Sequence, residues 1–191
     1  MITTTGEPKL HWNYFTALES DLEVAARYIE FSEANYDVYS IELAHLLFAA
    51  ASEVDVIAKA LCKRLQPGGT FRCINNYHSP LMSAFPSLPC DEVFIPRYAI
   101  RLKPWDEWSN PPDPKPHNPF WWRDYNMVKH HRNDHFQKAN LKNVLNAMGG
   151  LMLLAFQYYS HVLSTSGRYE TMIELMPEST LLRFPPNWYR M

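Results

Sequence analysis

Ionisable and amide side chains crowd residues 120–140, FWWRDYNMVKHHRNDHFQKAN. Arg123 and His130 stand seven residues apart, so on an α-helix they would share one face. An arginine can bind an anion through two parallel hydrogen bonds, and a histidine can exchange protons near neutral pH. The pair could therefore hold an anionic group and move a proton beside it.

Helical periodicity predicts a single helix from about residue 119 to about residue 164. With about 100° of rotation per residue, one stripe of this helix is polar. The stripe carries Arg123, Asn126, His130, Asn133, Gln137 and Asn140, with Lys129 at its margin. It then becomes apolar through Val144, Met148, Leu151 and Ala155. The polar half is therefore predicted to face inward, in the same direction as the apolar half.

Polar side chains on an inward face need partners or a cavity. A second, central helix is predicted over residues 38–65, and Glu42 and Glu53 share one face of it. These carboxylates are expected to support the cations of the polar stripe. Two interpretations stay open, namely a satisfied buried polar network that fixes helix register and an Arg/His site in a cleft.

The chain has 191 residues, of which 47% are hydrophobic and 14% aromatic, as in one folded domain. Its net charge of −2 excludes a global basic field, so any contact with nucleic acid would be local. Cys62, Cys73 and Cys90 form no CxxC pair, which favours a reducing compartment, and Cys62 is expected in the core. We see no signal peptide and no apolar run of about 18 residues, so a cytoplasmic protein without a membrane span is predicted.

The remaining patterns predict an all-α fold, a helical bundle formed by residues 1–191 as a single domain. A first helix is expected over residues 12–31, and Asp37 is expected to cap the second. Residues 67–119 contain eleven of the fifteen prolines and are predicted to form a long irregular insertion. Within it, residues 92–102 (EVFIPRYAIRL) could form a hairpin arm. Four aromatic residues are expected to hold the insertion on the helices: Phe94, Tyr98, Trp105 and Trp108.

The segment from Arg123 to His130 resembles the motif of the HEPN superfamily (higher eukaryotes and prokaryotes nucleotide-binding domains). That motif is an arginine, a polar residue and a histidine, with four to six residues between Arg and His. Here Asp124 is the polar residue, and six residues intervene. HEPN domains are all-α, usually dimeric, and many are metal-independent ribonucleases. The resemblance implies a homodimer of the toxin or phage-defence type, in which the motifs of two chains face each other.

The resemblance also implies roles for individual residues in RNA cleavage. His130 would act as a general base or acid, and Arg123 would bind the phosphate and stabilise the developing charge. Substrate binding would fall to Asn126, Lys129 and Asn133, and a supporting role to Asp124. Glu42 and Glu53 are supporting candidates because of their spacing on the second helix, not because of the resemblance. No metal ion or other cofactor would be needed. RNA and an antitoxin or another partner protein are the expected partners.

Other patterns have simpler explanations. His131 and His135 stand four residues apart and could bind a metal ion, but without a third ligand they are expected to be solvated. Phe120, Trp121 and Trp122 could stack on bases, although such clusters more often fasten a loop to the core. Two further functions stay open: a non-catalytic helical domain that binds a nucleotide or a protein, and a purely structural dimer.

Overall fold

A computed structural model describes residues 8–109, 117–168, 171–185 and 188. It is mainly α-helical, which confirms the predicted class, and the described residues contain one two-stranded sheet. The α-helices are α1 (Leu10–Ala25), α2 (Ile41–Leu65), α3 (Ile74–Ala84), α4 (Phe120–His130), α5 (Arg132–His135), α6 (Leu141–Thr165) and α7 (Thr171–Glu174). Short 3-10 turns are η1 (Glu33–Asn35), η2 (Pro96–Tyr98), η3 (Asp106–Ser109) and η4 (Phe136–Lys138). No helix in these ranges combines the length and the apolar composition needed to cross a membrane.

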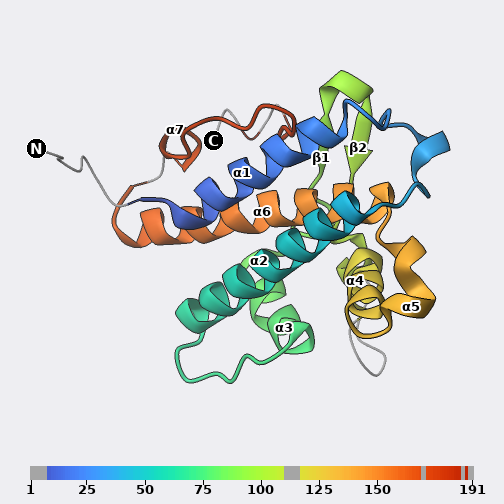
Figure 1. The fold of residues 1–191 in the computed structure, drawn as a ribbon. Helices are drawn as coiled ribbons and strands as arrows, with labels where there is room; N and C mark the ends of the chain where they lie inside the picture. The colour runs from blue at the N-terminus through green and yellow to red at the C-terminus, as the bar shows by residue number, and fades with distance from the viewer. Residues whose placement is uncertain (1–7, 110–116, 169–170, 186–187, 189–191) are drawn as a thin grey trace, which may run out of the picture.

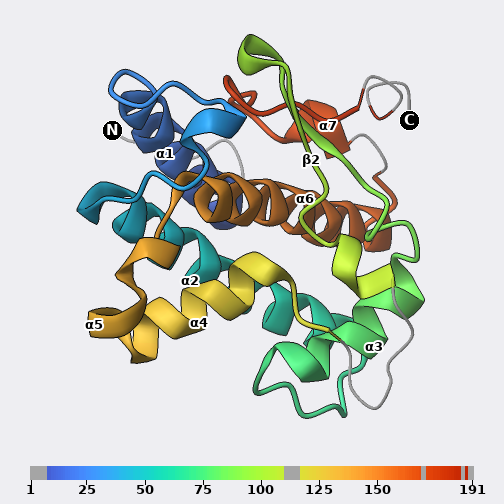
Figure 2. The same cartoon turned by 90° about the vertical axis from the view of Figure 1, so that its right-hand side faces the viewer.

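The two longest helices, α2 and α6, lie against each other at the centre of the molecule (Figures 1 and 2). Both α1 and α4 pack against this central pair. Each central helix begins with a side-chain cap, which satisfies a backbone N–H of its first turn. Ser40 accepts a hydrogen bond from the Leu43 N–H at 3.1 Å, and Asn140 accepts one from the Asn143 N–H at 3.0 Å. Ser40 caps α2, so the prediction of Asp37 is wrong.

The first helix is shorter than its sequence pattern predicts. It begins at Leu10 and ends at Ala25, whereas a helix over residues 12–31 was expected. The chain turns after Ala25, and Phe31 is buried against the Tyr98 ring, with 4.9 Å between the ring centroids. The prediction is therefore wrong beyond Ala25, because burial of Phe31 beside the hairpin stabilises the turn more than another helical turn would.

The segment that follows α2 is more regular than its proline content predicts. α3 lies within it and accommodates Pro80. The Tyr77 hydroxyl of α3 donates to Asp55 of α2 at 2.8 Å, and Leu81 is fully buried. The prediction of an irregular insertion is wrong over α3, because packing against α2 outweighs poor intrinsic helix propensity. The tract 110–116 lies outside the described residues.

The hairpin considered for residues 92–102 is present. β1 (Val93–Ile95) and β2 (Ile100–Leu102) pair antiparallel, with Phe94 opposite Arg101. The C-terminal segment joins the other side of β1, where Phe94 and Arg183 exchange two backbone hydrogen bonds of 2.8 Å. Phe94 therefore lies between two arginines across this small sheet.

Four tryptophans connect the hairpin region and α4 to the core. Their rings form a continuous chain in the order Trp108, Trp105, Trp121 and Trp122, with successive centroids 4.5, 5.5 and 5.7 Å apart. All four are buried, and the Trp121 indole N–H donates to the Pro104 carbonyl at 2.8 Å. Trp105 and Trp108 thus hold the insertion as predicted. Trp121 and Trp122 fasten α4 to the core and offer no free ring face to a base.

α6 continues through Gly149 and Gly150, and the two glycines have different surroundings. A Cβ on Gly150 would lie 3.1 Å from the Trp121 ring and 3.4 Å from Trp105, whereas a Cβ on Gly149 would meet Leu102 at 3.4 Å. We expect Gly150→Ala to lower the free energy of unfolding by about 1–2 kcal/mol, because the packed rings cannot move aside. Gly149→Ala should be neutral or stabilising by up to about 1 kcal/mol through helix propensity. Urea denaturation measures both values, and equal effects would contradict this packing.

The helix predicted over residues 119–164 is interrupted. α4 ends at His130, where His131 adopts the non-helical angles φ −138° and ψ 48°. α5 and η4 connect α4 to α6, and the chain changes direction between them (Figure 2). α6 begins at Leu141, and Asn140 caps its first turn. A polar stripe continuous with the apolar stripe of α6 therefore does not exist. The prediction that the polar half faces the core is wrong.

A buried carboxylate fastens the C-terminal segment to α1. The side chain of Glu19, which is 1% exposed, accepts hydrogen bonds on Oε1 from the Leu181 and Leu182 N–H groups at 3.0 and 2.8 Å. The Ser179 hydroxyl donates to the same oxygen at 2.5 Å, and the Thr180 N–H donates to Oε2 at 3.0 Å. All these partners lie in one short segment, so hydrogen bonds stabilise the buried charge.

Candidate functional site

Arg123 lies near the N-terminal end of α4, and its guanidinium is bound within the chain. Nη2 donates to Glu107 Oε1 at 2.9 Å, and Nη1 donates to the Asn118 carbonyl. The Arg123 side chain stays 48% exposed. Glu107 belongs to η3, and its Oε2 is buried without a hydrogen-bond partner in the described part of the chain. Arg123 therefore joins α4 to η3, and an anion can reach it only in competition with this ion pair.

His130 lies exposed at the opposite end of α4. Seven residues of α-helix place it about 10 Å from Arg123 along the helix axis. Helix geometry puts the two side chains on one face, as predicted, although they are far from contact. A single chain therefore does not place both residues around one small anion.

The carboxylate of Asp124 is hydrogen-bonded within the chain. Its Oδ1 accepts a hydrogen bond from Lys138 Nζ at 2.5 Å, and its Oδ2 accepts one from Asn143 Nδ2 at 3.0 Å. Asn143 is buried and also donates to the Lys138 carbonyl at 2.8 Å. These bonds hold α4, η4 and the first turn of α6 together. Asp124 thus supports the shape of the chain between α4 and α6.

The two α2 carboxylates that were predicted to support the α4 cations, Glu42 and Glu53, have partners elsewhere. Glu53 Oε1 is 2.5 Å from His11 Nδ1, so Glu53 joins α2 to α1. Glu42 lies in the first turn of α2, its side chain is 80% exposed, and its Oε2 is 3.7 Å from His45 Nδ1. The prediction that Glu42 and Glu53 support the α4 cations is wrong, because each carboxylate has a different histidine partner.

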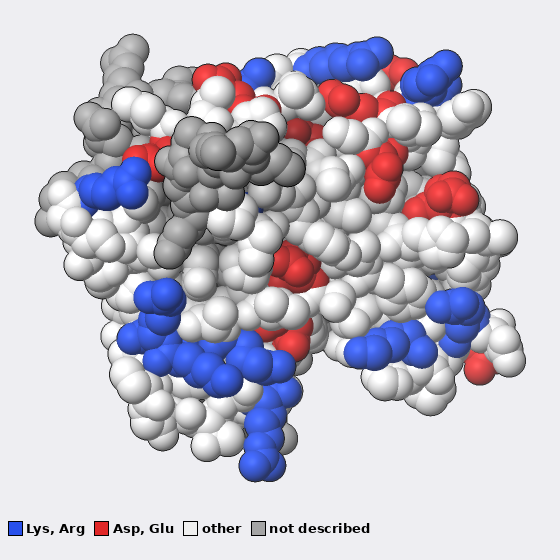
Figure 3. Space-filling model, turned by 60° about the vertical axis from the view of Figure 1, so that its left-hand side comes forward, with Lys and Arg blue, Asp and Glu red and all other residues white. Residues whose placement is uncertain are grey.

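The residues around the break between α4 and α5 form a basic surface, which we call the α4–α5 corner. It consists of Lys129, His130, His131, Arg132 and His135. None of these five makes an ion pair with another described residue, and Asp134 is the carboxylate within the same stretch. Figure 3 shows that Lys and Arg side chains gather on two lobes at the lower edge of the molecule, with a recess between the lobes.

Two cations of the corner lie over aromatic rings. Lys129 Nζ is 5.3 Å from the centroid of the Tyr125 ring, and Arg132 Cζ is 5.1 Å from that of Phe48. The Tyr125 and Phe48 rings meet edge to face, with 5.7 Å between centroids. Phe48 belongs to α2, so the corner rests on the central helix. The rings hold these two exposed cations in place, and exposed basic side chains can contact the phosphates of a nucleic acid.

The three residues predicted to bind substrate differ in exposure, since Lys129 and Asn133 are exposed and Asn126 is partly buried. Lys129 is part of the corner, and Asn133 is exposed beside it. Asn126 is partly buried, and its Nδ2 donates to the Trp122 carbonyl one turn earlier at 3.0 Å. Because Arg123 and most of the corner are exposed, the interpretation as a buried polar network is wrong.

The histidines with metal-ligand spacing, His131 and His135, have ring centroids 6.4 Å apart in an edge-to-face arrangement. Among the residues that the structure describes, no group of three or more His, Cys, Asp or Glu side chains is arranged to hold a metal ion.

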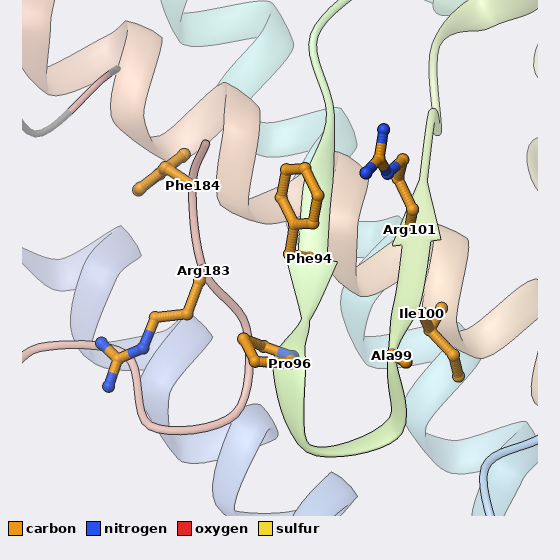
Figure 4. Close-up of a pocket in the computed structure, with 7 residues that line it drawn as sticks. All are labelled: Phe94, Pro96, Ala99, Ile100, Arg101, Arg183 and Phe184. Carbon is orange, nitrogen blue, oxygen red and sulfur yellow. The ribbon is translucent and has the colours of Figure 1, made fainter. Parts of the chain in front are cut away.

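A hollow of about 730 Å³ lies on the outer face of the hairpin. It is largely apolar and is lined by Phe94, Pro96, Ala99, Ile100, Arg101, Arg183 and Phe184. Figure 4 shows Arg101 and Arg183 extending in different directions on either side of Phe94. The hollow therefore lacks the convergent polar groups that a catalytic pocket needs.

A second hollow, of about 590 Å³, lies beside the Arg123–Glu107 pair. Its charged lining residues are Glu33, Arg101, Lys103, Asp106, Glu107 and Lys142. Burial, and to a smaller degree Glu33, raise the pKa of Tyr36 in its wall. Because the positive and negative groups balance, this hollow attracts a polyanion less than the α4–α5 corner does.

Sequence reasoning missed Phe48 and gave no role to Arg132. Phe48 lies in a helix predicted to be central, and nothing in the pattern of α2 indicates that its ring reaches the surface under a cation. The sequence did contain an indication that Arg132 is exposed, because it ends an uninterrupted run of basic residues, Lys129, His130, His131 and Arg132. Such a run indicates an exposed end of a helix more readily than an inward stripe.

Comparisons of this chain with protein-family models, with curated proteins and with solved structures found no match.

Proposed function

We propose that the chain is an HEPN-like, metal-independent endoribonuclease of the toxin or phage-defence type, and that it cleaves RNA at the α4–α5 corner. One observation carries this proposal: exposed His130 lies between Lys129 and Arg132, whose charged groups cover the Tyr125 and Phe48 rings. The corner thus combines two cations that can contact phosphates with a group able to transfer protons. The cytoplasm, which holds RNA and keeps thiols reduced, is the proposed location.

The reaction needs only RNA and these side chains. His130 takes the proton of a 2′-hydroxyl, whose oxygen attacks the adjacent phosphorus. The bond from phosphorus to the 5′-oxygen breaks, which leaves a 2′,3′-cyclic phosphate and a 5′-hydroxyl. Lys129 and Arg132 stabilise the negative charge that develops on the phosphate oxygens. A protonated imidazole supplies the proton to the leaving 5′-oxygen, and His131 is the neighbouring candidate.

Arg123 would contribute to the site in a homodimer. Two α4 helices that met face to face would bring Arg123 of one chain towards His130 of the other, as the HEPN resemblance implies. The half-exposed guanidinium of Arg123 supports this arrangement, although its ion pair with Glu107 must open. If the active form is a monomer, Arg132 takes the same role. Light scattering at several protein concentrations separates the two cases.

A second candidate function is RNA binding without cleavage. No carboxylate or carbonyl in the described part of the chain accepts a hydrogen bond from the His130 ring, whereas catalytic histidines are commonly oriented by such a group. This observation favours a binding domain unless RNA or a second chain orients the ring. Binding and cleavage must therefore be measured separately.

Removing both cations that flank His130 should weaken RNA binding. For the double variant Lys129→Ala, Arg132→Ala we expect about tenfold lower affinity for single-stranded RNA near 0.1 M salt. The slope of log affinity against log salt should also become shallower by about 1.4, because two phosphate contacts are lost. Fluorescence anisotropy with a labelled oligonucleotide measures both quantities.

The matched control is Arg101→Ala, Lys103→Ala, which removes two exposed positive charges from the hairpin region. The control should retain nearly the wild-type affinity and slope. If both double variants weakened RNA binding equally, the affinity would depend only on the net charge of the protein. That result would contradict the assignment of RNA binding to the α4–α5 corner. In EDTA, wild type should also cut a mixed RNA, and binding without any cutting would favour the second candidate function.

A further inference from the structure

A groove of about 720 Å³ lies between the C-terminal half of α1 and the N-terminal half of α2, on a different part of the surface from the α4–α5 corner. Most of its wall is apolar or small. The lining residues are Leu18, Asp21, Val24, Ala25, Tyr28, Ile29, Val38, Ser40, Glu42, His45, Leu46 and Ala49. Residues of α1 and α2 form most of the wall, and the connection between these helices adds Tyr28, Ile29, Val38 and Ser40. No residue of β1 or β2 lines the groove, so it offers no edge of that sheet to an extended peptide.

Large apolar side chains around the groove are unusually exposed. Tyr28 is 80% exposed, Val24 51% and Val38 38%, and the neighbouring Ile41 is 64% exposed. Several such side chains beside one hollow form a continuous apolar surface, which typically marks a site of protein association. Their exposure is therefore typical of a groove to which another protein binds.

The fully charged residues that line the groove are of one sign. Asp21 and Glu42 lie in its wall, His45 is the other titratable side chain there, and no Lys or Arg lines it. An occupant with positive charges beside an apolar surface would complement both properties.

We propose that this groove binds an amphipathic α-helix of a partner protein, with Lys or Arg beside the apolar face of that helix. Apolar residues of the partner at positions i, i+3 or i+4, and i+7 would enter between α1 and α2, where Leu18, Leu46 and Ala49 form part of the groove wall. Tyr28 and Ile41 would cover the sides of the bound helix. The basic residues of the partner would then lie near Asp21 and Glu42.

A second copy of this chain fits the groove less well. An isologous contact brings the same patch of both copies together. Asp21 and Glu42 would then face the same acidic residues, without a Lys or Arg in the groove wall to balance them. The proposed partner is therefore a different protein that carries positive charge.

The test uses a labelled designed helix of about 18 residues, with a leucine face and flanking lysines, and measures fluorescence anisotropy with the full chain. A matched peptide carries glutamate in place of each lysine. We expect the lysine peptide to bind at least about tenfold more tightly than the glutamate peptide, with affinity that falls as salt rises. Val24→Ala, Tyr28→Ala should weaken the lysine peptide at least about tenfold.

The matched control variant is Leu10→Ala, Tyr14→Ala, which removes two exposed apolar side chains from the other end of α1. It should change the affinity less than about twofold, because neither residue lines the groove. Equal binding of both peptides, equal loss in both variants, or no binding of either peptide would overturn the proposal. So would light scattering that shows a dimer which Val24→Ala, Tyr28→Ala converts to a monomer. Each of these outcomes is independent of RNA cleavage.

Discussion

Replacing Glu19 by alanine is expected to lower the free energy of unfolding by about 3–5 kcal/mol, the largest effect of any single substitution considered. The wild-type carboxylate satisfies the backbone N–H groups of Thr180, Leu181 and Leu182 in a buried place. Alanine leaves these donors without an acceptor and leaves a cavity. Glu19→Gln keeps one acceptor oxygen but loses the charge, so we expect an intermediate loss.

Urea denaturation measures this loss, and limited proteolysis shows where it acts. New cleavage of Glu19→Ala should begin in the C-terminal segment, because the segment that pairs with Glu19 also pairs with β1 through Arg183. Asp21→Ala is the matched control, since this carboxylate lies exposed on the same helix. A Glu19→Ala protein as stable as the Asp21→Ala protein would contradict the proposed role of the buried carboxylate.

Replacing His130 by alanine is expected to reduce RNA cleavage about 10²- to 10⁴-fold, the usual contribution of a general acid or base. Affinity for RNA should change little, because Lys129 and Arg132 remain to contact phosphates. Unfolding should occur at nearly the wild-type temperature, since the side chain is exposed and has no partner within the described chain. Initial rates on a mixed RNA substrate in EDTA give the comparison.

His131→Ala is the companion variant, because it removes the adjacent exposed imidazole that we propose as the proton donor. Reduced cleavage by His131→Ala would support that role, and unchanged cleavage would place the proton donor elsewhere. Cleavage that is equal in wild type and His130→Ala would place the active group elsewhere. Binding by both proteins without cleavage by either would leave the corner as a binding surface only.

The central helices were the most predictable part of the fold. A nearly all-round apolar pattern predicted a helix over residues 38–65, and the structure has α2 at Ile41–Leu65 with Cys62 fully buried. Met148 and Met152 are buried in α6 for the same reason. α3 could not be predicted in this way. Its sequence is a poor helix former, and its stabilising contacts come from α2, far away along the chain.

The site was less predictable than the fold, because its geometry depends on one interruption. Helical spacing continues through His131 in the sequence, and only the backbone conformation shows that α4 stops there. Asn140 was a recognisable cap residue, and it could have indicated the start of a separate helix. Glu53 could not be assigned by spacing either, since its partner His11 lies on another helix.

The Glu19 contacts have a consequence for how the protein is made. The carboxylate lies on the first helix, but its donors are 160 to 163 residues further along the chain. At a synthesis rate of about 5–20 residues per second, the ribosome needs roughly ten to thirty seconds to reach them. Until then, α1 can dock only with an uncompensated carboxylate at a position that later becomes buried. Completion of the core around α1 is therefore a late step of biosynthesis, and a nascent chain stalled before residue 179 would present Glu19 to water or to chaperones.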